Sequence, residues 1–232
     1  MPKGKFNVIP DLNSEGTKNM PLSLAGDTDV SCGQTTPETL VKGFEKIGCE
    51  AVVTADPQVV LQAERVVLPG VGAFRDCMHN LEQGGFVEPI LKIIAEGRPF
   101  LGICVGMQLL FTDSVEFGLY NGLNVIPGHV LRFPDQMTVA GEKLKVPQMG
   151  WNQLHFKRRP PAFEGVADNS NVYFVHSYYV QPDDEGVIAT TTDYGIEFCS
   201  SIWKDNVVAT QFHPEKSQAI GLQILKNFAE LT

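Results

Sequence analysis

From about residue 36 onward, short apolar stretches alternate with segments in which apolar residues recur at helical spacing. The first helix is predicted to begin at Thr36-Pro37-Glu38, which supplies a capping hydroxyl, a proline at the first helical position and an acid in the first turn. Leu40, Phe44 and Ile47 form its apolar side, and Gly48 ends it. Apolar runs at residues 51–54, 65–68 and 99–101 predict strands, and residues 73–80 and 87–96 predict further helices. This alternation predicts a parallel sheet with helices on both faces.

The pattern changes after Gly122, where short strands separated by turns replace the alternation. The predicted strands cover residues 130–133, 154–156, 172–175, 187–190 and 207–210, and a final helix covers residues 218–231. No repeat, low-complexity tract or linker divides the chain. We therefore expect one α/β domain over residues 36–232, preceded by an atypical segment over residues 1–35.

A cysteine between two glycines lies where a predicted strand passes into a helix. The segment Gly102-Ile103-Cys104-Val105-Gly106 follows the apolar residues 99–101 and precedes residues 107–111, which suit a helix. This is the sequence form of a nucleophile elbow, in which a tight turn leaves no room for neighbouring side chains. The N-terminus of the following helix favours the thiolate, which is the reactive form of cysteine. These five residues also suit a small buried cysteine beside structural glycines.

A second segment supplies the groups that a cysteine nucleophile needs. In Val208-Ala209-Thr210-Gln211-Phe212-His213-Pro214-Glu215, a strand leads to His213, and Glu215 follows two residues later. A carboxylate bonded to one ring nitrogen fixes the tautomer of the imidazole and supports its protonated form. Together with the elbow, this pattern favours a Cys-His-Glu arrangement over a structural histidine and a surface glutamate.

Composition limits the other classes of function. The 232 residues are 43% hydrophobic and 19% charged, which is ordinary globular composition. The net charge of −9 argues against nucleic acid as a partner, because phosphate binding needs clustered Lys and Arg. No apolar run approaches the roughly 20 residues of a membrane span, and the start of the chain does not read as a secretory signal. Five scattered cysteines show neither metal-ligand nor disulfide spacing, so we expect no metal, no cofactor and a cytoplasmic location.

The elbow at residues 102–108 and the segment Gln211-Phe212-His213-Pro214-Glu215 resemble the class I (triad-type) glutamine amidotransferases. Other segments are more specifically similar to the glutaminase subunits of imidazole glycerol phosphate synthase. These segments cover residues 68–74, 146–154, 173–180 and 210–218 and occur in the expected order. The resemblance implies a flavodoxin-like α/β fold with a mostly parallel central sheet, helices on both faces and an antiparallel C-terminal portion.

The resemblance also implies roles for particular residues. Cys104 would attack the side-chain amide of glutamine, His213 would transfer protons, and Glu215 would hold His213. The oxyanion donors would come from Val105 and from the loop that contains Val71 and Gly72. The positions that match those holding the glutamine substrate are Gln108, Glu116, Ser177 and Tyr178.

Trp151, Tyr173 and Lys216 match positions that face a synthase subunit in the family. The implied partner is a (βα)8-barrel cyclase of histidine biosynthesis, and ammonia made at Cys104 would pass into it. Two other hypotheses stay open: a glutaminase that serves another acceptor, and a catalytically silent partner that docks on a barrel subunit. Residues 149–152 and 176–179 speak against another acceptor, and an intact Cys104, His213 and Glu215 speak against a silent partner.

The N-terminus departs from the family pattern. The family begins with an apolar strand running into Asp-Tyr-Gly-x-Gly-Asn, whereas residues 1–35 here are polar and rich in turn formers. The missing strand would be central to the sheet, so another segment must replace it or leave its neighbours unpaired. The two candidates are Phe6-Asn7-Val8-Ile9, which has the better β-propensity, and Leu22-Ser23-Leu24-Ala25, which lies nearer the first helix. Without such a strand, we expect a marginally stable or inactive protein.

Overall fold

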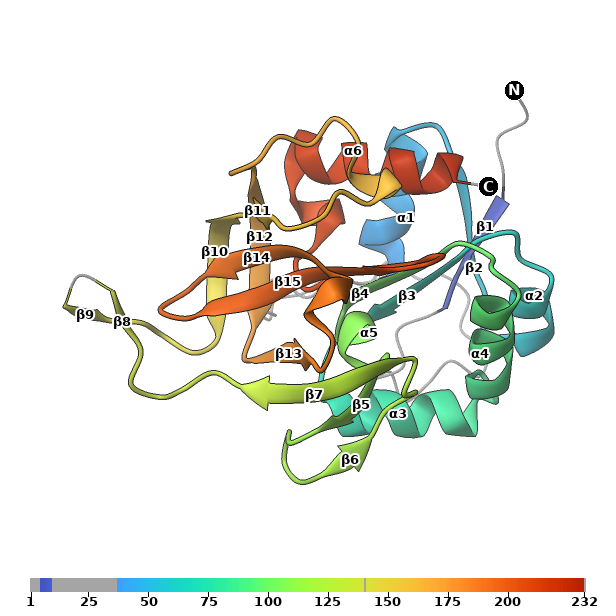
Figure 1. Ribbon diagram of the computed structural model, residues 1–232. Helices are drawn as coiled ribbons and strands as arrows, with labels where there is room; N and C mark the ends of the chain where they lie inside the picture. Colours follow the sequence, from blue (N-terminus) through green and yellow to red (C-terminus); the bar gives the residue numbers. More distant parts are fainter. Residues whose placement is uncertain (1–4, 10–36, 140, 232) are drawn as a thin grey trace, which may run out of the picture.

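One large curled sheet forms the centre of the protein (Figure 1). The computed structural model describes residues 5–9, 37–139 and 141–231. Half of the sheet is parallel and consists, in spatial order, of β2 (Glu50–Val53), β1 (Lys5–Val8), β3 (Val66–Gly70), β4 (Phe100–Cys104) and β16 (Val207–Thr210). All five residues of β3 and of β4 are buried, as expected for strands covered on both faces.

Strand β1 replaces the strand that the sequence left open, although it lies second from the β2 edge of the sheet and not at its centre. It pairs in parallel with β2 on one side and with β3 on the other. Val8 and the following Ile9 are fully buried, and the Ile9 N–H donates to the Val67 carbonyl at 3.1 Å. The sequence left two candidates open for this strand, and the first of them, residues 6–9, overlaps β1. The other candidate, residues 22–25, lies outside the described residues.

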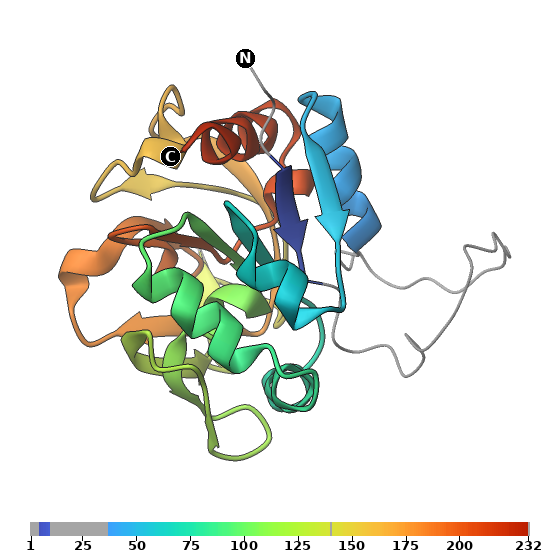
Figure 2. The ribbon, with the colours of Figure 1, turned by 90° about the vertical axis from the view of Figure 1, so that its right-hand side faces the viewer.

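Helices cover both faces of the parallel half (Figures 1 and 2). On one face lie α1 (Pro37–Lys46) and α6 (Gln218–Glu230), which contact each other. On the other face lie α2 (Pro57–Leu61), α3 (Phe74–Gln83) and α4 (Val87–Ala95), of which α2 and α4 are in contact. None of the helices in the described residues is long and apolar enough to cross a membrane.

The other half of the sheet is mostly antiparallel. Beyond β16 the order is β15 (Glu197–Lys204), β13 (Tyr178–Pro182), β7 (Ile126–Arg132), β5 (Phe111–Ser114) and β6 (Tyr120–Asn121), while β14 (Ile188–Asp193) and β11 (His155–Phe156) branch from β15. Two small sheets lie beside it, formed by β10 (Gln148–Gln153) with β12 (Asn171–His176) and by β8 (Thr138–Val139) with β9 (Glu142–Lys143). Short 3₁₀ helices are η1 (Pro161–Phe163), η2 (Glu185–Val187) and η3 (Pro214–Lys216). The predicted fold class is confirmed, and the division at residue 36 stays a prediction.

The helix expected at residues 107–111 starts earlier and is shorter than predicted. Helix α5 spans only Val105–Gln108, and Phe111 already begins β5. The following chain ends the helix, because the backbone N–H groups of Leu123, Val125 and Ile126 donate to the carbonyls of residues 109 and 110 at 2.8–3.0 Å. A long-range contact therefore stops a helix that the local pattern would continue.

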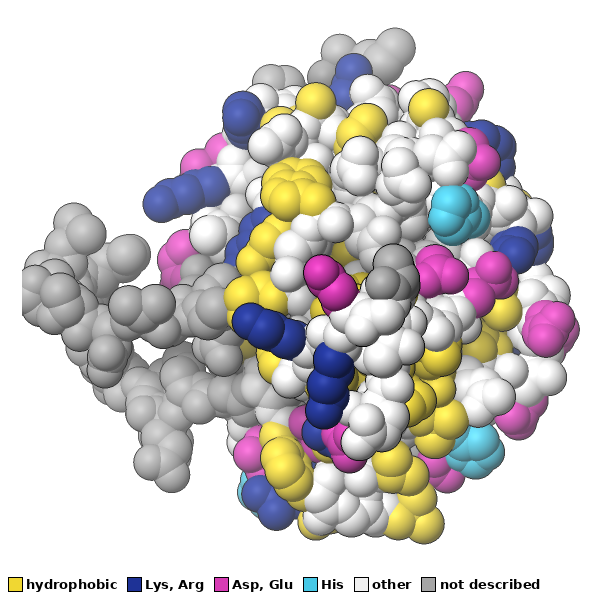
Figure 3. Space-filling model, turned by 90° about the vertical axis from the view of Figure 1, so that its left-hand side faces the viewer, with side chains coloured by type: hydrophobic (Ala, Val, Ile, Leu, Met, Phe, Trp, Pro, Cys, Tyr) yellow, Lys and Arg dark blue, Asp and Glu magenta, His cyan; other side chains and the backbone are white. Residues whose placement is uncertain are grey.

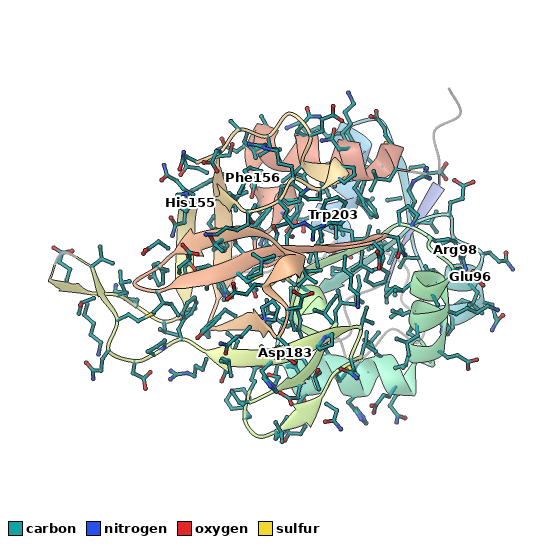
Figure 4. The ribbon with its side chains drawn as sticks, in the orientation of Figure 1. Glu96, Arg98, His155, Phe156, Asp183 and Trp203 are labelled. Atoms are coloured by element: carbon teal, nitrogen blue, oxygen red, sulfur yellow. The ribbon has the colours of Figure 1, made fainter. Side chains whose placement is uncertain are left out.

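Arg98 holds the turn that leads from α4 into β4. Its side chain lies beside Glu96 in Figure 4, with Nη2 2.6 Å from Glu96 Oε2. Its Nη1 also donates to the carbonyl of Leu61, at the end of α2, at 2.9 Å. These bonds fix the entry to the strand that ends at Cys104.

Candidate active site

Three neighbouring parallel strands deliver their carboxyl ends to one edge of the sheet. Gly70 at the end of β3 lies in register with Cys104 at the end of β4, and Thr210 at the end of β16 lies beside Ile103. Sites in open parallel sheets form beyond these ends. The loops that follow the three strands carry the residues 71–72, 104–108 and 211–215 of the predicted site.

Cys104 occupies a strained elbow. Its backbone angles, φ 56° and ψ −112°, are rarely adopted by residues other than glycine. Such conformations cost about 1–3 kcal/mol. Neighbouring glycines make the turn possible, because a Cβ on Gly106 would lie 1.9 Å from the Leu68 carbonyl oxygen and one on Gly102 2.8 Å from the Gly106 carbonyl oxygen. The predicted lack of room beside the cysteine is confirmed. The turn directs the buried sulfur toward the loop that follows β16.

His213 and Glu215 form a buried pair beside this cysteine. The Nδ1 atom of His213 lies 3.0 Å from Glu215 Oε1, and the two side chains are 1% and 0% exposed. Burial lowers the pKa of His213, but the charges and hydrogen bonds of Cys104 and Glu215 outweigh it and raise this pKa to about 10. The imidazole therefore holds a proton at neutral pH, and Glu215 balances its charge.

A cavity of about 230 Å³ opens at the cysteine. This volume is below the usual range for drug-sized ligands and suits a small metabolite. Nine predicted site residues line it: Val71, Gly72, Cys104, Val105, Gln108, Glu116, Ser177, Tyr178 and His213. The structure thus brings residues from widely separated segments of the chain around one small space.

Glu116 is held by the start of helix α3. Its Oε2 accepts a hydrogen bond from the Phe74 N–H at 2.6 Å, one of the N–H groups that a helix N-terminus leaves without an intrahelical partner. Burial raises the pKa of Glu116, an effect that the Phe74 N–H partly offsets. With one oxygen fixed in this way, the carboxyl group is oriented at the wall of the cavity.

The loop after β3 has a defined peptide orientation. The Val71 carbonyl accepts a hydrogen bond from Cys77 Sγ at 3.4 Å. Because the C=O and N–H of a trans peptide point in opposite directions, the N–H of Gly72 points away from Cys77. The N–H of Val105 belongs to the first turn of α5, where helical N–H groups have no intrahelical partner.

The three predicted interface residues lie beside the triad. Trp151 on β10 pairs with Tyr173 on β12, their rings 5.9 Å apart at 71°, and Trp151 is 48% exposed. The Tyr173 carbonyl accepts from the His213 N–H at 3.0 Å, and half-buried Lys216 follows Glu215 directly. In Figure 3 the end of the molecule that carries β10 faces the viewer, and hydrophobic side chains form a band there with Lys and Arg beside it.

Two buried residues at the site had no predicted role. His176 Nδ1 donates to the Tyr178 carbonyl at 2.8 Å, and its Nε2 lies 2.9 Å from Gln148 Oε1. Burial, assisted by the nearby charge of His213, lowers the pKa of His176 to about 3, although its bond to Tyr178 opposes this. Gln211 contacts both Cys104 and Gln108. Both residues occur in the motifs that carry the family resemblance, but no local pattern reveals their contacts.

Within the described residues, no three His, Cys, Asp or Glu side chains gather as they would around a metal ion. The arrangement instead suits covalent catalysis by a thiol with an imidazole and a carboxylate in support. Its edge-of-sheet position and its cavity are those of an active site.

Comparison with known proteins agrees with this geometry. The model of the family "Glutamine amidotransferase class-I" matches residues 30–231. The chain belongs to the class I glutamine amidotransferases. It is therefore an enzyme subunit of that family, and the predicted family is confirmed.

Curated relatives identify the branch of the amidotransferase family. The chain is 75% identical over 202 residues to "Imidazole glycerol phosphate synthase subunit HisH" of Geobacter sulfurreducens, covering 87% of this chain and 97% of the relative. The protein of the same name from Geobacter metallireducens is 74% identical over 200 residues, covering 86% and 95%. A third, from Syntrophotalea carbinolica, is 60% identical over 202 residues, covering 87% and 98%.

Solved structures of low sequence identity support the fold alone. PurLQS from Thermotoga maritima has a TM-score of 0.65 at 14% identity, covering 97% of each chain. The glutaminase domain of CTPS from Trypanosoma brucei has a TM-score of 0.58 at 13% identity, covering 99% of this chain and 95% of that chain. The amidotransferase sheet is thus shared well beyond the sequence relatives.

Proposed function

We propose that this amidotransferase is the glutaminase subunit of an imidazole glycerol phosphate synthase and that it supplies ammonia to a (βα)8-barrel cyclase in histidine biosynthesis. The observation that carries the proposal is the buried Cys104, His213 and Glu215 set at the mouth of a cavity of about 230 Å³. The printed name of the relatives at 60–75% identity supports this acceptor over the others.

In the proposed reaction, Cys104 Sγ attacks the side-chain amide carbon of glutamine. His213, which holds a proton at neutral pH, gives it to the departing ammonia as the C–N bond breaks, and a glutamyl thioester remains. His213 then takes a proton from water, which attacks the thioester and releases glutamate and the cysteine. Glu215 keeps the imidazole oriented and balances its charge through both steps.

Two backbone groups would stabilise the tetrahedral oxyanion. One is the N–H of Val105 in the first turn of α5, and the other comes from the Val71–Gly72 peptide. The Val71 carbonyl is at present bonded to Cys77 Sγ at 3.4 Å. A rearrangement of this peptide when the partner binds would explain a subunit that is nearly idle alone.

Polar groups of the cavity suit an amino acid. The Glu116 carboxyl is oriented by the Phe74 N–H and would bind the α-ammonium group of glutamine. Ser177, Tyr178 and Gln108 line the same cavity and would hold the remaining polar groups. Cys104 reacts only as a reduced thiol, and the cytosol keeps thiols reduced, which supports a cytoplasmic location.

The band of exposed apolar side chains around Trp151 would receive the cyclase. Trp151 and Met149 are each 48% exposed on β10, and the Tyr173 carbonyl is bonded to the backbone of His213. A partner seated here would cover the site and receive ammonia away from water, where ammonia would be protonated and lose its nucleophilicity.

The decisive experiment measures glutamate release by the chain with and without its cyclase subunit. We expect strong stimulation by the cyclase and loss of activity in Cys104→Ala, whereas Cys49→Ser, at a half-buried cysteine away from the site, should keep activity. Activity that survives Cys104→Ala would refute the nucleophile. No stimulation by the cyclase would count against the proposed acceptor.

Docking is tested separately with Trp151→Ala. Because this side chain is 48% exposed, its removal should leave the unfolding midpoint nearly unchanged while weakening cyclase binding by at least about tenfold. Leu91→Ala, which truncates a 38% exposed side chain on α4 at the other face of the sheet, serves as the control in the same titration. Equal affinities of the two variants would place the interface elsewhere.

A further inference from the structure

Gln211 lies directly after β16 and is fully buried between two residues of the active site. Its Nε2 donates to Cys104 Sγ at 3.6 Å, and its Oε1 accepts from Gln108 Nε2 at 3.0 Å. Its backbone N–H donates to the Ser200 carbonyl at 2.9 Å. The residue is thus fixed at both its backbone and its side chain.

A backbone carbonyl determines which way these two amide groups face. The Tyr178 carbonyl can only accept, so Gln108 presents its Nε2 to it, at 3.1 Å. The second hydrogen of this Nε2 is then available to the Gln211 oxygen. With its oxygen engaged by Gln108, Gln211 presents its own Nε2 to the sulfur of Cys104. The direction of every hydrogen bond in the series from Tyr178 to Cys104 therefore follows from the fact that the Tyr178 carbonyl can only accept.

We propose that Gln211 is a positioning residue that aims the Cys104 sulfur and stabilises its thiolate by donating a hydrogen bond to it. This proposal rests on the proposed function only in assuming that the thiolate attacks glutamine. An N–H bond to an ionised acceptor is about twice as strong as one to a neutral acceptor, so the donor favours thiolate over thiol. Burial strengthens this hydrogen bond, because Gln211 is fully buried and electrostatic interactions are stronger in a medium of low dielectric constant.

The same network leaves Gln108 able to bind a ligand only as a hydrogen-bond acceptor. Both hydrogens of its amide are bonded within the protein, to the Tyr178 carbonyl and to Gln211 Oε1. Only its carbonyl oxygen is left for a ligand in the cavity that it lines, so Gln108 acts there as an acceptor. Gln211 therefore orients one residue of the glutamine pocket and the nucleophile at once.

The test follows alkylation of Cys104 by iodoacetamide in the full chain from about pH 5 to about pH 10, because the thiolate is the form that reacts. Mass spectrometry of the peptide that contains Cys104 separates it from the other cysteines. The variants are Gln211→Met, which keeps the length of the side chain without its donor, and Gln211→Glu, which keeps an acceptor for Gln108 but places an oxygen beside the sulfur. Ser200→Ala is the matched control, since its hydroxyl is fully buried and bonds to Thr190 rather than to the site.

We expect the midpoint of the alkylation profile to rise by about one pH unit in Gln211→Met, with a rate about tenfold lower at pH values below the wild-type midpoint. Gln211→Glu should shift it at least as far, and Ser200→Ala should match the wild type. If Gln211 merely fills space in the core, unfolding midpoints will fall but the alkylation midpoints will stay at the wild-type value, and the proposal is overturned. If Gln211→Met does not fold, Gln211→Leu decides the matter, because it also lacks the donor and, unlike Gln211→Glu, adds no charge that would raise the midpoint by repulsion alone.

Alkylation requires neither glutamine nor a partner subunit. A shifted profile in a chain that proves to have no glutaminase activity would keep the positioning role and reject the proposed function. Unshifted profiles together with cyclase-stimulated glutaminase activity would reject the positioning role and keep the proposed function. The two proposals therefore fail separately.

Discussion

Replacing Ile9 by alanine tests whether the N-terminal residues form an interior strand of the sheet. Ile9 is fully buried, and its N–H donates to the Val67 carbonyl at 3.1 Å directly after β1. Truncating a buried isoleucine to alanine costs about 2–5 kcal/mol, because transfer free energy is lost and a cavity remains. Folded domains are stable by only about 5–15 kcal/mol, so the variant should lose a large part of its free energy of unfolding.

The assay is urea denaturation of the full chain, followed by circular dichroism. Val53→Ala is the control, because Val53 lies on the neighbouring β2 but is 43% exposed, and its truncation should cost about 0.5 kcal/mol. Equal denaturation midpoints for the two variants would refute the reasoning, since they would mean that residues 5–9 do not belong to the core. Because β1 pairs with β3, glutaminase activity should be lost at a lower temperature in Ile9→Ala than in the control.

Two further predictions concern the histidines of the site. Glu215→Gln removes the charge 3.0 Å from His213 Nδ1 and should lower glutaminase activity by about 100-fold or more in the presence of the cyclase. The raised pKa of His213, about 10 against an ordinary value of 6.5, contributes stability that is complete below pH 6.5 and is lost as the pH rises through 10. In Glu215→Gln this loss should begin at lower pH in urea titrations, and identical pH profiles would contradict the role of the carboxylate. For His176, a folded pKa of about 3 against an ordinary 6.5 means that only the unfolded chain gains the proton between these values, so stability falls as the pH drops through that window. His176→Gln should remove this component, at most about 1.4 kcal/mol per pH unit, and a wild-type acid slope in that variant would show that His176 is protonated in the fold.

Some features were predictable because their physics is local. Thr36-Pro37-Glu38 and Gly48 mark the two ends of the first helix, which the structure has as α1 (Pro37–Lys46). The glycines on either side of Cys104 predict the elbow, since only a residue without a side chain fits beside the Leu68 carbonyl. The strand leading to His213 begins with the apolar residues 207–209 and forms β16.

Strand β15 was not predicted, although it is the longest strand described. Its sequence contains Ser200 and Ser201, which interrupt the apolar pattern expected of a buried strand. Both serines are fully buried, and both hydroxyls lie within hydrogen-bonding distance of Thr190 Oγ1 on β14, at 2.9 and 2.6 Å. Burial of a polar side chain depends on a partner across the sheet, which the pattern along one strand does not reveal.

The sequence by itself determined the family, the α/β alternation that precedes Cys104, the elbow and the closeness of His213 to Glu215 two residues away. It could do so because turn chemistry, periodicity and close spacing act within a few residues of the chain. Only the tertiary structure decided that residues 5–8 form the strand between β2 and β3 and that Gln211 donates to the Cys104 sulfur. Gln211 is 107 residues from Cys104 and 103 from Gln108 in sequence, and these contacts exist only because β16 lies beside β4.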